Sequence, residues 1–230
     1  MSEWNWNLVA VPSHGLGGER GLSGELAWRI AGGLERMFAL GALAALSPVL
    51  LAAGVTIRCL SGEAPLVAHL RVGRKGRPLW MLKFRTMWGD RRRRNATRPR
   101  LVERISDEAG PSLKSFSDPR VRSRFARFCR RFSIDELPQL LHVARGEMSL
   151  VGPRPLTAGE LEEHYDGCAD EVLEVKPGLS GLWQVMGRNR LSYEQRRAYD
   201  LLYVRNRSLR LYLTILARTP VEVFSGKNSC

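Results

Sequence analysis

Residues 37–57 form a long apolar run that contains no charged side chain. As an α-helix, these 21 residues would be about 32 Å long at 1.5 Å per residue, which is enough to cross the hydrocarbon layer of a membrane. A buried core helix is the alternative, but a wholly apolar segment of this length is unusual in a small soluble domain. We therefore expect three regions: a variable extension (residues 1–23), a membrane-inserted helix (24–58) and a domain outside the membrane (59–230).

Ser47 and Pro48 lie at the middle of this run, and we expect them to break the helix. A proline inside a helix removes one backbone hydrogen bond and its ring clashes with the preceding turn. In lipid, a nearby serine can help to satisfy the carbonyl that is freed. Two topologies follow from this break: a kinked helix that spans the membrane, or a re-entrant helix that returns to the face it entered.

The basic residues are distributed unevenly around the apolar run. Residues 1–36 contain three and residues 58–94 contain eleven, within a chain whose net charge is +13. The positive-inside rule therefore places the part after residue 58 in the cytoplasm, while leaving the side of residues 1–36 open. A positive excess of this size also indicates an anionic partner: nucleic acid, an anionic membrane surface or a phosphorylated substrate.

The segment after the apolar run begins with two short β-like stretches. They lie within residues 66–84 and flank a turn that contains Gly73, Gly76 and Pro78, which predicts a hairpin. Residues 88–117 are polar and predict a loop. Residues 121–132 then place Val121, Phe125, Phe128 and Phe132 at helical spacing, with arginines on the other face. This pattern predicts a basic amphipathic helix suited to a membrane surface.

The carboxy-terminal half carries clear helix-start signals. Thr157 with Glu160, and Ser192 with Gln195, each have the spacing of a capping box. The tail after residue 200 mixes apolar residues with arginine. It fits a second interfacial element and an ordinary core helix equally well.

Asp135 and Glu136 are adjacent carboxylates at an expected helix start. Ser133, Asp135 or a residue close by should cap this helix. Pro138 is best placed in the first helical turn, which favours Asp135 as the N-cap of a helix that runs to about Ala144 and stops at Gly146. The positive end of a helix dipole keeps carboxylates ionised and attracts phosphate. For an isolated acidic pair, a plain capping role would be the simpler interpretation.

Several strings make the chain resemble the bacterial sugar transferases, that is, the monotopic phosphoglycosyl transferases. The resemblance covers about residues 25–225. Its most specific strings are SIDELPQLLHVARGEMSLVGPRP at 133–155 and KPGLSGLWQVMGR at 176–188. SPVLL at 47–51, RVGRKGRP at 71–78, KFRTM at 83–87, DPRV at 118–121, Asp200 and YVRN at 203–206 also match.

The resemblance implies both a fold and a reaction. The fold is α/β but mostly helical, in a monotopic membrane protein with one re-entrant N-terminal hydrophobic helix, amphipathic interfacial helices and a small cytoplasmic catalytic domain. Such enzymes move a sugar 1-phosphate from a nucleotide sugar, here expected to be a UDP-sugar, to a polyprenyl phosphate such as undecaprenyl phosphate. The family residue matching Asp135 is the nucleophile that forms a covalent phosphosugar intermediate, and the one matching Glu136 binds Mg²⁺.

The residues agree with this chemistry. A carboxylate that attacks phosphorus faces charge repulsion, so Mg²⁺ and arginines must neutralise the site. The candidate phosphate-binding side chains are Lys83, Arg85, Arg130, Arg154 and Arg188. Two departures from the family pattern stand out. Only Arg71 remains of a string rich in phenylalanine and arginine, and Glu35 replaces the family's aspartate but keeps its charge.

Together these features predict an enzyme of the bacterial inner membrane that starts exopolysaccharide, O-antigen or related glycoconjugate synthesis. Its expected partners are the nucleotide sugar, the polyprenyl phosphate and membrane lipids, with no nucleic acid; a homodimer is also considered. The rival interpretations are a basic nucleic-acid-binding protein and a membrane scaffold without catalysis. A nucleic-acid-binding protein would not need residues 37–57 and would wash off membranes with salt.

Overall fold

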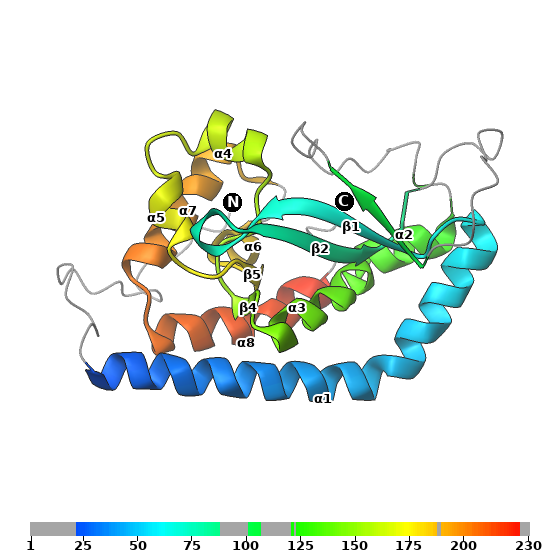
Figure 1. The fold of residues 1–230 in the computed structure, drawn as a ribbon, viewed down its shortest axis with the longest axis horizontal. Coiled ribbons are helices and arrows are strands. Elements are labelled where there is room, and N and C mark those ends of the chain that lie inside the picture. Colours follow the sequence, from blue (N-terminus) through cyan, green and yellow to red (C-terminus); the bar gives the residue numbers. More distant parts are fainter. Residues whose placement is uncertain (1–21, 88–100, 107–120, 122, 188–189, 226–230) are drawn as a thin grey trace.

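A computed structural model describes residues 22–87, 101–106, 121, 123–187 and 190–225. It places a small domain of short strands and helices on one side of a long bent helix (Figure 1). The elements, in chain order, are α1 (Leu22–Ser61), β1 (Leu66–Val72), η2 (Arg74–Gly76), β2 (Pro78–Phe84), β3 (Val102–Ile105), α2 (Arg124–Arg131), η4 (Ile134–Gln139), α3 (Leu140–Arg145), β4 (Ser149–Val151), α4 (Ala158–His164), α5 (Ala169–Leu173), β5 (Gly178–Ser180), α6 (Leu182–Met186), α7 (Tyr193–Arg205) and α8 (Leu209–Ser225).

The apolar run lies inside α1, which extends from Leu22 to Ser61 and so reaches beyond the expected 24–58 segment at both ends. Pro48 lies inside the helix, which bends sharply (Figure 1), while a re-entrant break at Ser47 and Pro48 stays a prediction. Pro48 has no N–H to donate to the carbonyl four residues earlier, that of Ala44. The Ser47 hydroxyl donates to this oxygen over 2.8 Å. The hydroxyl therefore supplies a bond that the backbone cannot make.

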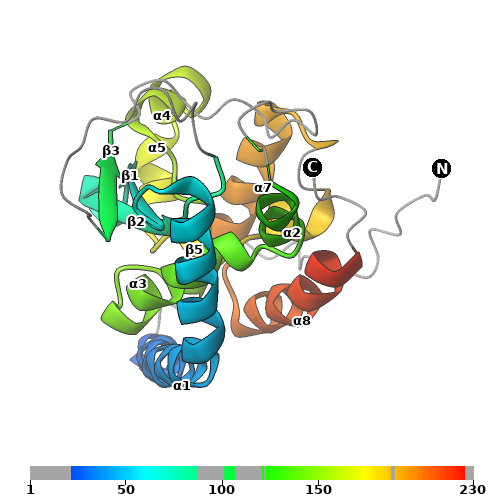
Figure 2. The ribbon, with the colours of Figure 1, turned by 90° about the vertical axis from the view of Figure 1, so that its right-hand side faces the viewer.

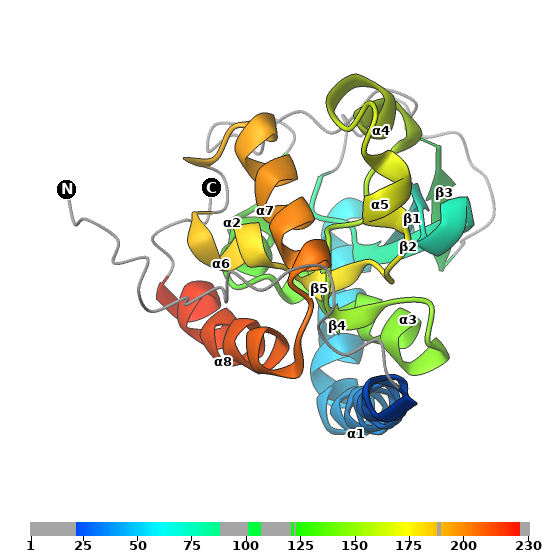
Figure 3. The same cartoon turned by 90° about the vertical axis from the view of Figure 1, so that its left-hand side faces the viewer.

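Both halves of α1 pack against the small domain. Before the bend, Ala39 is buried in the main hydrophobic core, which also contains Val143 of α3 and Ile215 of α8. After the bend, Ala53 and Ile57 pack with residues of β2 and α2. Figures 2 and 3 show the first half of α1 running beneath the domain, with α3 and α8 above it.

Glu35 fastens the first half of α1 to the domain. Its carboxylate accepts hydrogen bonds from the Ser149 hydroxyl at 2.5 Å, the Leu150 N–H at 2.9 Å and the Tyr212 hydroxyl at 2.6 Å. The Glu35 carboxylate therefore joins α1 to β4 and α8.

The opposite face of α1 is apolar and exposed. By length and composition, its residues Gly24–Ser61 could cross a membrane. The exposed large side chains of the helix are Leu26, Ile30, Leu34, Met37, Phe38, Leu40, Val49, Leu51, Val55 and Leu60. Exposing so many large apolar groups to water is unfavourable, so this face is suited to lipid.

The predicted hairpin is confirmed, since β1 and β2 pair antiparallel with Val67 opposite Lys83. The prediction of a loop throughout 88–117 is wrong at Val102–Ile105, which form β3 and pair parallel with β1. Their polar composition gave no strand signal. Pairing with the open edge of β1 satisfies the backbone of this segment, and only the tertiary fold provides that edge.

The predicted basic amphipathic helix is confirmed as α2, with the Ser123 hydroxyl accepting from the Ala126 N–H as its cap. Its two faces have different surroundings. Ala126, Cys129 and Arg130 are buried, whereas Phe128 is half exposed. The helix is rotated this way because Ala126 packs against α1 and its last turn contacts η4.

The chain after α2 corrects the predicted N-cap. Asp135 is not a cap but lies in the first turn of the 3₁₀ segment η4, which leads directly into α3. Ser133 adopts a left-handed conformation, with φ 55°, that makes the turn from α2 into η4. The predicted stop at Gly146 is confirmed, because this residue closes α3 with φ 75°.

Both capping boxes are present, at the starts of α4 and α7. The tail forms α8, which packs as a core helix on one face, while an interfacial role of its other faces stays a prediction. Tyr212 and Ile215 are buried in the main core, while Leu213 and Val221 on other faces are exposed.

Candidate active site

The acidic pair lies at a junction of three elements. Asp135 is buried, with 5% of its surface exposed, and Glu136 is half-buried in the same turn of η4. The Glu136 N–H donates to the Ser133 carbonyl over 3.1 Å, which ties the pair to the turn after α2. The strand β2 and the end of α2 both pack against η4. The pair is therefore held in a fixed place.

Asp135 lies close enough to the end of α2 for its charge to act on the thiol of Cys129. Burial, with a smaller contribution from the negative charge of Asp135, raises the pKa of this thiol to about 11. Arg130, the next residue, is buried beside it. An arginine predicted from its spacing to bind phosphate thus lies in the last turn before the acidic pair.

Arg154 faces Glu136 from the turn after β4. Its Nη1 lies 3.7 Å from Oε1 of Glu136, and its side chain is 30% exposed, so it can also reach an incoming anion. Its turn is fixed by the parallel pairing of β4 with β5. Gly152 donates to the Ser180 carbonyl, and Gly178 donates to the Pro153 carbonyl. A Cβ on Gly178 would lie only 2.1 Å from the Gly152 nitrogen, so glycine is required for this close approach.

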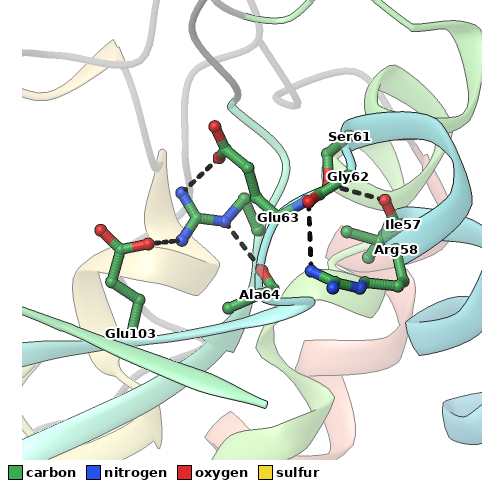
Figure 4. A network of polar contacts seen from close by, with 8 residues as sticks. Ile57, Arg58, Ser61, Gly62, Glu63, Ala64 and Glu103 are labelled. Carbon is green, nitrogen blue, oxygen red and sulfur yellow. Dashed lines mark hydrogen bonds and ion pairs between the residues drawn. The ribbon is translucent and has the colours of Figure 1, made fainter. Parts of the chain in front are cut away.

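Arg85 and Lys83 differ in their surroundings. The Arg85 guanidinium pairs with Glu63 at 3.0 Å and with Glu103, and its Nε donates to the Ala64 carbonyl over 2.8 Å. Figure 4 shows Glu63, Ala64 and Glu103 gathered around this one guanidinium. A phosphate would have to compete with these partners, so its role in phosphate binding stays a prediction.

Lys83 lies half-buried on β2, the strand that packs against η4. This position is compatible with its predicted role. Arg188 lies outside the described residues. The structure therefore brings Asp135, Glu136, Arg130 and Arg154 together around η4, with Lys83 on the strand beside it.

A buried polar cluster beside Arg154 had no role in the sequence-based mechanism. Asp200 is fully buried on α7 and accepts a hydrogen bond from the Tyr165 hydroxyl at 2.8 Å. Burial raises the pKa of Asp200 to about 8, against the favourable charges of Arg154 and Arg196. Arg196, one turn earlier, stacks over Trp183 at 4.8 Å. The only sequence signal for this cluster was the match of Asp200 to the family pattern.

Arg71, the remaining arginine of the altered string, is buried in an ion pair. Its Nη1 lies 3.3 Å from Oε2 of Glu160, the capping-box residue of α4. This contact joins β1 to α4 and gives Arg71 a structural role.

The acidic pair also fits a magnesium ion chemically. Mg²⁺ is commonly held by one or two carboxylates together with substrate phosphates and water. Among the described residues, no group of three or more His, Cys, Asp or Glu side chains could enclose a metal. Glu136 and Asp135, adjacent on one short turn, match the first arrangement rather than an all-protein cage.

A sequence model described as bacterial sugar transferase matches residues 28–226. The chain belongs to the bacterial sugar transferase family. The match covers most of α1 as well as the domain that carries η4, so the helix is part of the family unit.

Named bacterial sugar transferases are similar to this chain over most of its length. A UDP-galactose-lipid carrier transferase of Erwinia amylovora is 45% identical over 81% of the chain. The exopolysaccharide production protein ExoY of Sinorhizobium fredii is 41% identical over 84% of it. An undecaprenyl-phosphate galactose phosphotransferase of Salmonella typhimurium is 41% identical over 69% of it.

These relatives differ in size. The aligned part spans 39% of the Erwinia protein and 33% of the Salmonella protein, but 84% of ExoY. This sugar transferase thus corresponds to a part of the longer relatives and to nearly all of the shorter one.

Proposed function

We propose that this bacterial sugar transferase moves a sugar 1-phosphate from a UDP-sugar to undecaprenyl phosphate at the inner membrane and so initiates the synthesis of an exopolysaccharide or related glycoconjugate. Two of the relatives are named for transfer to undecaprenyl phosphate or to a lipid carrier, and another for exopolysaccharide production. Their names support the substrate classes.

One observation carries the proposal. Asp135 and Glu136 lie together on η4, with Arg154 3.7 Å from Glu136 and with β2 and α2 packed around the same turn. Two adjacent acids with cations beside them suit an attack on a phosphate ester. Glycosidic bond cleavage needs a different arrangement, with two carboxylates about 5 Å or more apart on either side of the bond.

The proposed first step is attack by an Asp135 carboxylate oxygen on the phosphorus that bears the sugar. A new oxygen–phosphorus bond forms as the bond to the departing uridine monophosphate oxygen breaks, which leaves an acyl phosphosugar on the enzyme. In the second step, a phosphate oxygen of the lipid attacks the same phosphorus and releases the Asp135 carboxylate. No net proton transfer is needed in either step.

The surrounding side chains bind and neutralise the phosphates. Arg154 offers a fork of N–H donors that matches two phosphate oxygens, and Arg130 and Lys83 add positive charge near η4. Glu136, with Asp135 beside it, would hold Mg²⁺, which lowers the repulsion between the carboxylate and the phosphates when it is bound.

The packing of α1 supports a re-entrant topology. Both halves of this apolar helix contact the same small domain, through Ala39 before the bend and Ile57 after it. A straight span would carry one half away from the domain. With the basic residues after position 58 in the cytoplasm, the proposed arrangement places both ends of α1 on that side.

A turnover assay tests the proposal. Purified full-length protein in detergent, with Mg²⁺ and undecaprenyl phosphate, is screened against a panel of nucleotide sugars for release of nucleoside monophosphate. We expect release that depends on both the lipid phosphate and a UDP-sugar. Absence of release with every donor would favour a scaffold without catalysis.

A further inference from the structure

The structure contains a basic cavity that Asp135, Glu136 and Arg154 do not line. Its volume is about 1300 Å³, and it lies between the β1–β2 hairpin, β3 and the end of α3. Six basic side chains line it: Arg74, Lys75, Arg77, Arg104, Arg145 and Lys176. The mechanism proposed above uses none of them.

The two acidic residues of the cavity are engaged elsewhere. Glu103 pairs with Arg85. Glu147 accepts from Nδ1 of His142 at 2.5 Å, since Nε2 of that ring accepts the Leu82 N–H at 3.1 Å. Each carboxylate thus already has a partner outside the set of six cations. The cavity keeps a strong excess of positive charge.

Lys176 shows that positive charges gather at this wall of the cavity. The side chain is half-buried; burial lowers its pKa, and the charges of Arg36, Arg74 and Arg207 lower it further against the opposing charge of Glu35. Arg36 of α1 reaches the cavity wall at Gly146, where a Cβ would lie 2.3 Å from the guanidinium. A bound anion would relieve this repulsion between like charges.

The position of Arg36 indicates which class of anion lies close to the cavity. Arg36 is the last charged residue before the uncharged run 37–57, so it lies where α1 enters the apolar layer. Arg207 stacks over Trp28 of α1 at 3.8 Å, two residues before α8 begins. Aromatic and basic side chains that flank an apolar segment are typical of the headgroup level of a membrane.

We propose that this basic cavity binds the phosphate headgroup of an anionic phospholipid. The proposal rests on the membrane arrangement of the proposed function, but not on its chemistry. Basic pockets beside membrane helices on the cytoplasmic side are suited to such headgroups. A bound lipid would hold the hairpin against the end of α3 and α1, two elements that Gly146 and Arg36 already bring into contact.

Binding measurements on delipidated full-length protein in neutral detergent test this proposal. Short-chain phosphatidylglycerol and short-chain phosphatidylcholine are titrated into wild type and into the Arg145→Gln, Lys176→Gln double variant. We expect wild type to prefer phosphatidylglycerol by at least about tenfold and the double variant to lose this preference, because each cation near a lipid phosphate contributes about 1 kcal/mol. Arg205→Gln is the matched control: it removes a cation that pairs with Glu171 on the surface of α7, and it should keep the preference.

Other outcomes contradict the proposal in different ways. An unchanged preference in a folded double variant would show that the cavity is not the binding site, and thermal melting checks the fold. Displacement of phosphatidylglycerol by equal concentrations of inorganic pyrophosphate would assign the cavity to a soluble anion. Neither binding measurement uses a nucleotide sugar. A negative result for lipid binding can therefore be distinguished from a negative result in the transferase assay.

Discussion

Arginine side chains that look alike in the sequence have different surroundings in this fold. Arg85 is held by Glu63, Glu103 and a carbonyl, whereas Arg154 has one long contact to Glu136 and remains partly exposed. A guanidinium with several protein partners has to give some of them up to bind a phosphate, so this role of Arg85 stays a prediction. One with a single partner and an accessible fork can bind a phosphate directly.

The first prediction concerns Asp135. Asp135→Asn keeps the size of the side chain but removes its nucleophilicity, so stability should change little. We expect loss of turnover and of the labelled protein adduct that wild type forms from donor alone. Glu136→Gln should also lose activity, with partial recovery at excess Mg²⁺. Equal labelling of Asp135→Asn and wild type would refute the covalent step; turnover without labelling of either would favour direct attack by the lipid phosphate.

The second prediction concerns Arg154. Arg154→Lys keeps the charge but loses the forked donor pair, so kcat/KM should fall at least tenfold, which is about 1.4 kcal/mol of transition-state stabilisation. Steady-state kinetics and a melting curve measure the two effects separately. Arg205→Lys, in an exposed pair, is the matched control and should leave both unchanged. Near-wild-type turnover of Arg154→Lys would assign Arg154 to structure.

The third prediction concerns pH. The pKa of Asp200 is raised from 3.8 to about 8 in the fold because the group is buried. The folded protein therefore binds a proton that the unfolded chain releases near pH 4. This contribution to stability is fully present below that value and is lost as the pH rises through about 8. Asp200→Asn should flatten the fall in melting temperature over this range, and an identical pH slope in both proteins would contradict the assignment.

At the scale of elements, α1 combines two packing tasks in one helix. Its first half completes the main core through Ala39 and the Glu35 hydrogen bonds, and its second half packs through Ile57 against β2 and α2. Only a bent helix can do both. The bend leaves the Ala44 carbonyl without a backbone donor, and the Ser47 hydroxyl replaces it.

The fourth prediction tests this replacement. Ser47→Ala should destabilise the protein by about 1–2 kcal/mol, because a carbonyl left without a donor in lipid is costly. Ser47→Thr is the matched control, since it retains the hydroxyl. Thermal melting in detergent or nanodiscs compares the three proteins. Equal melting temperatures for Ser47→Ala and wild type would mean that water or lipid satisfies this carbonyl instead.

At the scale of the whole molecule, apolar surface and basic charge meet around α1. The exposed face of α1 and the exposed Leu213 and Val221 of α8 are suited to lipid, while the basic cavity opens beside Arg36. A domain that packs against both halves of its apolar helix can hold its candidate active site close to an acceptor that lies in the membrane. A homodimer stays a prediction.

The fifth prediction concerns topology. Ala10→Cys, in a chain whose native cysteines are replaced, should resist a membrane-impermeant thiol reagent in intact cells and react after permeabilisation, since a re-entrant helix keeps residue 10 in the cytoplasm. Glu162→Cys on the exposed side of α4 is the control for a cytoplasmic position. Labelling of Ala10→Cys from outside would indicate a full span.

The sequence alone determined the features that depend on neighbouring residues. The apolar run, its Ser47–Pro48 bend point, the hairpin and both capping boxes depend on composition and short spacings, so they could be predicted. The acidic pair and the family were likewise evident from contiguous strings.

Contacts between distant segments were decided only by the tertiary structure. The strand Val102–Ile105 forms because β1 offers it an edge, and Arg130 is buried because α2 rotates to pack against α1 and η4. Asp135 enters a 3₁₀ turn instead of capping a helix, and six cations from the hairpin turn, β3, α3 and the segment before β5 surround one cavity. Each depends on which surfaces the folded chain brings together, and local propensity carries no information about that choice.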